Sequence, residues 1–443
     1  MTQTTSHPKS ARDTAVAGCP DGECLFWQPS RWQAFQQRLL ARHIAYASRS
    51  PLYCGRIPPV RGFGSAHLPS LPTTSRDELM QAGQRAYACQ AEEVREWVTT
   101  SGTTGQPLRV PLTASDLDRL AVNEAVALNI AGINAGDTLL IAVAFDRMFI
   151  AGLAYWLGAQ RLGASCVRAG PFYAADASAL RALAADYHRP FLLTVPSLLT
   201  GAMDASNQPP PTLAAIINIA EPVRRADLSP NALASRLSDH FHTPVLSTYA
   251  GTETCTTFAE GSQCRGGHLN PRLEVVEILD EAGQPVPNGI MGEVVVTPLG
   301  VKGMPLLRFR TGDLAALHPE PCPCGRTTPR LGPVVGRLHQ RLKVRGVSLF
   351  PGAISDWLQS VPAVREFVIV AEQDFDLSDR VTLHLALHQP TQDIRRRIKR
   401  QASTILRSSP HIVFTSPQAI EKLQRQASPR KPSRFLDLRA ARV

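Results

Sequence analysis

The residues best suited to chemistry lie in a run rich in hydroxyl groups and glycine, VTTSGTTGQP over residues 98–107. Glycine lets successive backbone N–H groups turn inward, and serine and threonine hydroxyls add donors, so such a loop can hold phosphate oxygens. The Walker spacing G-x-x-x-x-G-K-[ST] is absent. By spacing alone the run is only a weak indication of phosphate binding, because most segments of this composition are ordinary loops.

A second group of residues has the spacing of a metal site. Cys264 and His268 lie four positions apart, and Cys322 and Cys324 are separated by one residue. Thiolate and imidazole ligands suit tetrahedral Zn²⁺. The chain has nine cysteines in 443 residues, and a disulfide framework is not expected in a large core-forming chain. Spacing leaves two alternatives, a structural zinc site or free cysteines.

Positive charge is concentrated at the C-terminal end. The formal net charge is +10, and residues 391–443 hold thirteen Lys and Arg against three acids. The run DIRRRIKRQASTILRSS predicts an amphipathic basic helix. Such a face is often simply solvated, but it also suits cofactor phosphates, an acidic carrier protein or nucleic acid. Aromatic residues do not alternate with these arginines, which disfavours nucleic acid.

The elements that must position these groups follow two patterns. Short apolar runs separated by helix-length segments predict parallel strands with crossover helices at 139–145, 164–170, 191–196, 214–220 and 244–249. Runs at 273–280 and 292–298 instead predict antiparallel strands, and a final unit has strand patterns at 366–373, 381–388 and 411–414. We therefore expect a large multi-layered α/β domain with a β-rich appendage, followed by a small mobile α+β domain.

The predicted boundaries are a flexible leader over residues 1–25, a large domain over 26–337 and a small basic domain over 338–443. The longest uncharged apolar stretch, Met148–Ala159, is too short to cross a membrane, and Asp146 and Arg147 precede it. The first residues lack the apolar segment of a secretory signal. A cytoplasmic protein that does not bind membranes is therefore expected.

Further motifs occur in order along nearly the whole chain: FWQPSRWQAF (26–35), LPTTSRDELM (71–80), AEPV (220–223), STYAGTETC (247–255), MPLLRFRTGDLA (304–315), GRLHQRLKVRGVSLFP (336–351) and RKPSRFLDLR (430–439). Together with the hydroxyl-rich run, they make the sequence resemble the adenylate-forming superfamily of acyl-CoA synthetases and adenylation domains. Within that superfamily the sequence is most similar to phenylacetate–CoA ligases.

The resemblance implies a reaction in two steps. A carboxylic acid, with an aromatic acid favoured, attacks ATP and gives an acyl-adenylate and pyrophosphate, and the thiol of coenzyme A then displaces AMP. The alternatives are transfer to the phosphopantetheine thiol of an acidic acyl carrier protein, or to an amine. A non-catalytic relative and a nucleic-acid-binding protein are remote alternatives, and no nucleic-acid partner is expected. Relatives are often dimers, so a homodimer is left open.

The resemblance also implies roles for matching residues. The β- and γ-phosphates of ATP would be held by Ser101, Gly102, Thr103, Thr104 and Gly105. Thr252 would bond the α-phosphate, and Glu253 would bind Mg²⁺, which prefers oxygen ligands. Tyr249 would stack on adenine, Asp313 would accept the ribose hydroxyls, Arg337 would reach ribose and phosphates, and Glu221 would border the adenine pocket.

Lys431, with Arg434, matches the catalytic lysine that the family carries on its small domain, and a flexible point charge suits a pentavalent phosphate. The hinge between domains falls on His339, where the family usually has an acidic residue. Pro432 follows the lysine and stiffens that loop. These departures leave adenylation better supported than the second step, which depends on rotation of the small domain.

For the remaining sites the resemblance gives expectations of lower specificity. It favours a closed structural zinc site at Cys264, His268, Cys322 and Cys324, with Cys255 in reserve and with Cys19 and Cys24 as leader residues. The carboxylate pocket would be formed by Phe145, Asp146, Arg147, Phe149 and Tyr155. Asp146 and Arg147 either recognise a polar group of the substrate or form a surface ion pair.

Overall fold

The computed structural model describes residues 19–58, 65–100, 107–171, 176–204, 209–344, 347–373, 379–406, 410–427 and 433–439. The predicted phosphate loop at Ser101–Gly105 and the predicted catalytic Lys431 lie outside these residues. Their roles therefore stay predictions.

The apolar runs that predicted parallel strands form one five-stranded parallel sheet, which confirms that prediction. The strands β3, β5, β6 and β7 are buried, as expected when helices cover both faces of a sheet, whereas the edge strand β4 is partly exposed. The spatial order is β4-β3-β5-β6-β7. The strands are β3 (Thr138–Ala142), β4 (Ser165–Val167), β5 (Pro190–Thr194), β6 (Ala215–Asn218) and β7 (Val245–Leu246).

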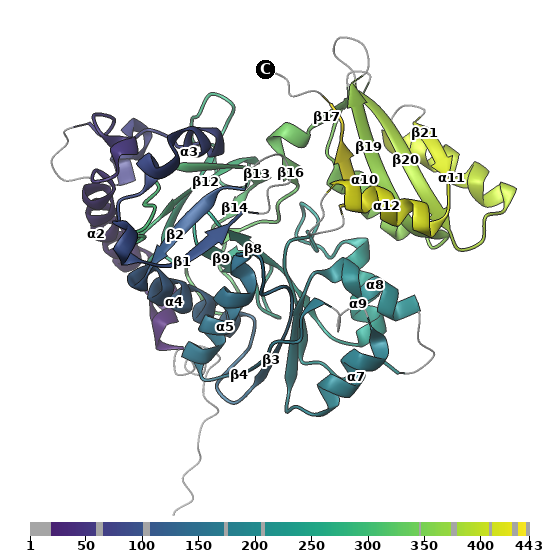
Figure 1. Ribbon diagram of the computed structural model, residues 1–443, viewed down its shortest axis with the longest axis horizontal. Coiled ribbons are helices and arrows are strands. Elements are labelled where there is room, and N and C mark those ends of the chain that lie inside the picture. The colour runs from purple at the N-terminus through teal and green to yellow at the C-terminus, as the bar shows by residue number, and fades with distance from the viewer. Residues whose placement is uncertain are drawn as a thin grey trace, which may run out of the picture.

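Alternate side chains of this sheet enter two different cores. Leu139 and Ile141 pack with α4 (Ala114–Ile130) and α5 (Ile150–Leu162) on one face. Leu140 and Ala142 pack on the other face with the helices α7 (Ala177–Ala185), α8 (Pro196–Asp204) and α9 (Ala232–Phe241). Figure 1 shows α7, α8 and α9 together beside this sheet.

Antiparallel strands surround the motifs of the expected nucleotide site. The hairpin β8 (Thr248–Gly251) and β9 (Thr256–Ala259) carries STYAGTETC. A four-stranded sheet in the order β11-β12-β13-β16 confirms the predicted antiparallel strands. Its strands are β11 (Glu274–Leu279), β12 (Gly292–Pro298), β13 (Phe309–Ala315) and β16 (Gly336–Arg337). The remaining strands of the N-terminal part are the hairpin β1 (Val94–Thr99) and β2 (Arg109–Thr113), and the sheet of β10 (Gly267–His268), β15 (Arg330–Leu331) and β14 (Leu317–His318).

The N-terminal helices brace this assembly, and they correct part of the expected leader over residues 1–25. Residues Pro20–Phe26 form a 3-10 helix whose Leu25 and Phe26, together with Cys19, belong to the core under α4. Thr327 donates to the carbonyl of Leu25 at 2.8 Å and so ties this helix to the loop that carries Cys322 and Cys324. Residues 19–25 are therefore packed. The helices α2 (Pro29–Ala47) and α3 (Arg76–Ala82) follow.

The C-terminal part, from residue 338 on, is α+β as predicted. Its mixed sheet has the order β21-β20-β19-β22. The helices α10 and α11 share one core with the sheet, whereas Ile420 of α12 packs on the opposite face. The elements are β17 (Leu342–Val344), β18 (Val347–Leu349), α10 (Pro351–Ser360), β19 (Val364–Gln373), β20 (Asp379–Leu387), α11 (Gln392–Leu406), β21 (His411–Phe414), α12 (Pro417–Ala427) and β22 (Phe435–Asp437). In the described part of the chain, no helix is long and apolar enough to span a bilayer.

Candidate active site

Asp313 is the centre of a cluster that joins three distant segments. In β13 it lies opposite Arg337 of β16 in the antiparallel register. Its Oδ1 accepts a hydrogen bond from Arg337 Nε at 2.8 Å, and its Oδ2 accepts one from Tyr249 Oη at 2.8 Å. Three residues to which the resemblance gives nucleotide-binding roles are thus held together by direct contacts.

The electrostatics of this cluster suit a polar nucleoside. Burial, together with the Asp313 carboxylate, raises the pKa of Tyr249 well above its ordinary value, so the phenol stays protonated and donates. The same carboxylate raises the pKa of Arg337. A carboxylate has about four lone-pair positions, so each oxygen of Asp313 keeps one for a ribose hydroxyl. The residues present therefore fit a ribose.

Tyr249 is also placed to stack. One face of its ring lies against Phe258 of the adjacent strand β9, with ring centroids 5.8 Å apart and an interplanar angle of 18°. The ring is only partly buried, which leaves its other face for a planar base. Thr252 and Glu253 lie in the turn that follows β8, where both are partly exposed.

Arg76 contacts the predicted magnesium ligand and was not singled out from the sequence. Its Nη1 donates to Glu253 Oε1 at 3.0 Å, and its Nη2 donates to Thr100 Oγ1 at 3.0 Å. Thr100 Oγ1 also accepts from the backbone N–H of Leu108 at 3.1 Å. Arg76 therefore joins Glu253 to the point where both ends of the 101–106 segment meet.

The backbone around Arg76 is held firmly. Ser75 and Glu78 form a capping box that makes Arg76 the first residue of α3. The backbone N–H of the buried Thr74 donates to the carbonyl of Arg308 at 3.1 Å, directly before β13, and its carbonyl accepts from the N–H of Arg310 at 2.8 Å, on the strand that carries Asp313. A signal existed in the sequence, because Ser-x-x-Glu predicts a helix start that presents the residue after the cap.

The segment 220–225, which follows β6, has a different arrangement from the one expected. The carboxylate of Glu221 accepts from the backbone N–H and the hydroxyl of Ser197 at 3.0 and 2.7 Å. Glu221 therefore caps the start of α8, so the segment can border an adenine pocket but this side chain is already engaged. Three residues further on, Arg224 forms a buried ion pair with Glu260.

Comparison with known proteins agrees with this geometry. The family described as AMP-binding enzyme matches residues 64–301, which is more than half of the chain. The chain belongs to this family. A phenylacetate–coenzyme A ligase of Thermus thermophilus is 29% identical over 392 residues, covering 81% of this chain and 82% of that protein. The resemblance read from the sequence is confirmed.

Solved structures share the fold of this AMP-binding enzyme. A crystal structure of 2-hydroxyisobutyryl-CoA ligase in the postadenylation state has a TM-score of 0.81 at 18% identity, covering 99% of this chain and 95% of that one. The same ligase in the thioesterification state has a TM-score of 0.65 at 20% identity and the same coverage.

The residues predicted for the carboxylate pocket of this AMP-binding enzyme differ in exposure. Tyr155 is buried, and its Oη lies 3.3 Å from Oγ1 of Thr248. Thr248 is the residue directly before Tyr249. Phe145 is exposed. Asp146 and Arg147 form an exposed ion pair at 3.4 Å, which is the surface alternative left open above. The pocket itself stays a prediction.

The four residues predicted to bind zinc converge on one point. The ligand atoms of Cys264, His268, Cys322 and Cys324 all lie within 4.8 Å of one another. Cys324 Sγ is 3.2 Å from Cys322 Sγ and 3.3 Å from His268 Nε2. Tetrahedral Zn²⁺ with Zn–S bonds of about 2.3 Å would require separations of about 3.7 Å, so small shifts would accommodate the ion.

The surroundings of the cluster also suit a metal. His268 Nδ1 lies 3.3 Å from Thr328 Oγ1, the kind of outer contact that orients a ligating imidazole. Hydrogen bonds with Cys264 and Cys322 lower the pKa of the Cys324 thiol. Hydrogen bonds with Cys322 and Cys324 raise the pKa of the Cys264 thiol. Cys255, the reserve ligand, lies elsewhere, with its thiol directed at the carbonyl of Thr252.

The predicted hinge lies where the two parts of the chain meet. His339 is in a one-turn 3-10 helix, Leu338–Gln340, between β16 and β17. Arg439 Nη2 donates to the His339 carbonyl at 3.0 Å, and Arg439 Nη1 donates to the Arg341 carbonyl at 2.9 Å. Burial lowers the pKa of the imidazole, with the charge of Arg337 adding to the effect. The hinge role stays a prediction.

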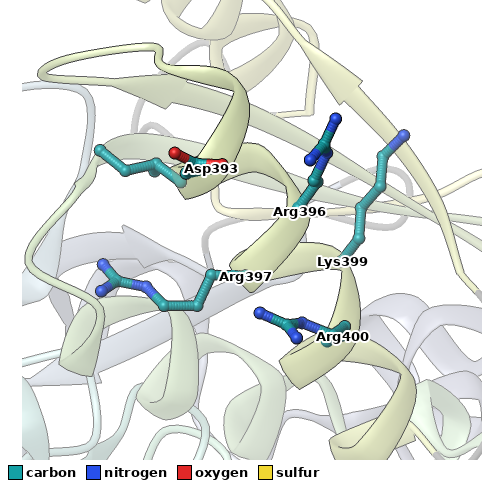
Figure 2. A pocket seen from close by; sticks show the side chains of 6 residues that line it. Asp393, Arg396, Arg397, Lys399 and Arg400 are labelled. Carbon is teal, nitrogen blue, oxygen red and sulfur yellow. The ribbon is translucent and has the colours of Figure 1, made fainter.

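The basic run forms the helix α11 as predicted. Its buried side consists of Ile398, Ala402 and Leu406. On its outer side an open pocket of about 620 Å³ is lined by Asp393, Ile394, Arg396, Arg397, Lys399 and Arg400. Figure 2 shows these cations extending from successive positions of the helix. Among the described residues, none of the four cations has an acid within ion-pair distance.

Proposed function

We propose that this AMP-binding enzyme activates a carboxylic acid with ATP and transfers the acyl group to coenzyme A. The observation that carries the proposal is the Tyr249–Asp313–Arg337 cluster, with Glu253 and Arg76 on the neighbouring turn. The relative named phenylacetate–coenzyme A ligase, which matches over most of both chains, supports the same reaction.

The reaction has two balanced displacements. A carboxylate oxygen attacks the α-phosphorus of ATP while the bond to the β-phosphate oxygen breaks and pyrophosphate leaves. The sulfur of coenzyme A then attacks the acyl carbon and loses its proton, and AMP leaves. Such transfers depend mainly on positioning and charge neutralisation.

The residues of this chain have distinct tasks in that scheme. Asp313 holds the ribose, Tyr249 stacks on the base, and Arg337 neutralises charge beside them. Thr252 bonds the α-phosphate, and Glu253 would bind Mg²⁺, which neutralises phosphate charge when bound. The Ser101–Gly105 segment and Lys431 act on the phosphates, as the resemblance implies.

The arrangement of the two parts of the chain favours the first displacement. Against one relative, the TM-score is 0.81 in the postadenylation state and 0.65 in the thioesterification state, at the same coverage. This difference supports an orientation of the C-terminal part close to that in which the adenylate is made.

An aromatic acid is the proposed substrate class. Phe145, Phe149 and Tyr155 come from one segment, and Arg168 lies 5.9 Å from the Phe145 ring. The names of the relatives that match over most of the chain point to an arylacetic acid.

A carrier protein is the second candidate acceptor, because α11 presents four cations around an open pocket, and none of them has an acid within ion-pair distance in the part of the chain that the structure describes. Helices of acyl carriers are acidic, and attraction between exposed charges is screened by salt. Transfer to a carrier should therefore fall steeply with salt while transfer to coenzyme A should not. Equal salt dependence would remove the carrier alternative.

We also propose that the Cys264, His268, Cys322 and Cys324 cluster binds a structural Zn²⁺. The donor set and the spacing of its atoms support this proposal. Four protein ligands close the coordination sphere, so the ion would stabilise the β-rich appendage and take no part in the displacements.

The test is a complete reaction with ATP, Mg²⁺ and coenzyme A over a panel of arylacetates, benzoates, cinnamates, fatty acids and amino acids. We expect AMP and an acyl-CoA in equal amounts with at least one aromatic acid. AMP formation without acyl-CoA would point to another acceptor, and no AMP with any acid would contradict the proposal.

A further inference from the structure

A single carboxylate of the C-terminal part makes two hydrogen bonds to the N-terminal part. Asp356, on the helix α10, accepts from Arg225 Nε through Oδ2 at 2.7 Å. Its Oδ1 accepts from the backbone N–H of Ala232 at 2.7 Å. Within the described part of the chain, both hydrogen bonds of this carboxylate therefore cross between the two parts. Figure 1 shows α10 next to α9 at this junction.

The geometry of the contact suits a carboxylate. Ala232 is the first residue of α9, a helix whose cap Asn231 already bonds the N–H of Ala234 at 2.9 Å. Asp356 supplies a second acceptor at the positive end of that helix, where a negative charge is stabilising. The guanidinium of Arg225 adds a charge-assisted bond, and Asp356 raises the pKa of Arg225.

Asp356 does not belong to the core beneath α10. The buried residues of this helix are Pro351, Ile354 and Leu358, and Ile354 and Leu358 pack on the C-terminal sheet. Asp356 lies on the outer side, so its carboxylate serves the contact between the parts and not the core beneath the helix.

The other end of the contact lies in the segment that borders the expected adenine pocket. Between Ala220 and Arg225, Glu221 caps α8, Arg224 pairs with the buried Glu260, and Arg225 reaches Asp356. Glu260 also accepts from the N–H of Ser247 at 2.9 Å, two residues before Tyr249. Asp356 is therefore bonded to a segment that is itself anchored to the nucleotide site.

We propose that the contact of Asp356 with Arg225 and the start of α9 is a latch that holds the C-terminal part in the adenylation orientation. Asp356 acts as a positioning residue, and the latch must open before the C-terminal part rotates for acyl transfer. This inference rests on the proposed function for its two reaction steps. The contact itself rests on the hydrogen bonds alone.

A second ion pair between the parts provides the matched control. Arg341 Nη1 lies 3.0 Å from Glu281 Oε1, but the Glu281 side chain is 77% exposed. Exposed pairs of this kind contribute little. Glu281→Gln therefore removes an acid that joins the same two parts without disturbing the latch.

The experiment compares the full-length protein with its Asp356→Ala, Glu281→Gln and Arg225→Gln variants. Hydrogen exchange resolved to the Ala232 amide reports the latch, small-angle scattering reports the orientation, and neither measurement needs a substrate. We expect Asp356→Ala to exchange about threefold to tenfold faster at Ala232 and to scatter as a mixture of orientations. Glu281→Gln should match the wild type, and adding Arg225→Gln to Asp356→Ala should cause no further change.

The activity arm uses an acid that the panel shows to be adenylated. Asp356→Ala should lower pyrophosphate exchange about threefold to tenfold relative to acyl transfer from a supplied adenylate. Wild-type scattering in Asp356→Ala would overturn the latch, even if Ala232 exchanged faster. A blank acid panel would instead count against the proposed function, and scattering would still decide the latch.

Discussion

The buried pair of Arg224 and Glu260 allows the most quantitative prediction. The side chains of Arg224 and Glu260 are 4% and 0% exposed. One oxygen of Glu260 accepts from Arg224 and from the N–H of Ser247, and the other accepts from the N–H of Gly266 at 3.1 Å. Gly266 lies between Cys264 and His268 of the proposed zinc site, so one carboxylate connects that cluster, the 220–225 segment and the residue directly before β8.

The informative change is Glu260→Gln. Glutamine keeps one oxygen for Arg224 and Ser247, but its NH₂ group faces the N–H of Gly266, and the Arg224 charge becomes unpaired. Removing one partner of a buried ion pair costs about 3–5 kcal/mol. We expect the lower end, about 3 kcal/mol, because most hydrogen bonds survive. With unfolding entropy of about 2.1 cal/mol/K per residue over roughly 300 residues, the melting temperature should fall by about 5 °C.

Thermal unfolding is measured beside the control Glu320→Gln. Glu320 pairs with Arg330 at 3.4 Å, but its side chain is 62% exposed, so the control should lose at most about 2 °C. Adding Arg224→Met to Glu260→Gln should restore part of the loss, since no buried cation is then left unpaired. A Glu260→Gln protein that melts with the control would refute this reasoning. So would a double variant less stable than Glu260→Gln.

Four further predictions concern other sites. Arg76→Ala should weaken Mg²⁺–ATP binding about tenfold or more by calorimetry, because the charge-assisted hydrogen bonds to Glu253 and Thr100 are lost. Binding as tight as in the exposed control Arg85→Ala would contradict a role for Arg76 in nucleotide binding. Burial raises the pKa of Glu124 from 4.5 to about 7. The contribution of Glu124 to the free energy of unfolding is therefore complete below pH 4.5 and should be lost as the pH rises to 7. The melting temperature should fall less over this range in Glu124→Gln, and identical profiles would count against it. Protein purified without added metal should contain one zinc per chain, and Cys322→Ser should lose it; zinc well below one that is unchanged in the variant would contradict the site. Lys431→Ala should lose adenylation but still convert a supplied acyl-adenylate, whereas equal loss in both assays would disprove its role.

Much of the fold was predictable because its elements follow simple patterns. Continuous apolar runs such as 191–196 predicted buried parallel strands, and β5 occupies residues 190–194 in the middle of the sheet. The basic run at 395–400 predicted a helix with one apolar side, which is α11. The leader was wrong over 19–25, because a seven-residue 3-10 helix rich in Pro, Gly and acids has no periodic apolar pattern.

The site was predictable only where motif and contact coincide. Tyr249, Asp313 and Arg337 each lie in a motif, and the structure brings them together. Arg76 escaped notice because its partner Glu253 is 177 residues away, so no local spacing reveals the pair. Glu221 was given a place at the adenine pocket, but its carboxylate caps α8, a contact that depends on how two crossover segments meet.

The central claim is that this enzyme adenylates a carboxylic acid, and pyrophosphate exchange tests it most directly. The measurement follows label from pyrophosphate into ATP in the presence of Mg²⁺ and each acid of the panel, and it needs no acceptor. The account predicts exchange that depends on an aromatic acid and is lost in Asp313→Asn, because that change removes an acceptor from the ribose site. Folded protein that shows no acid-dependent exchange, or equal exchange in Asp313→Asn, would contradict it.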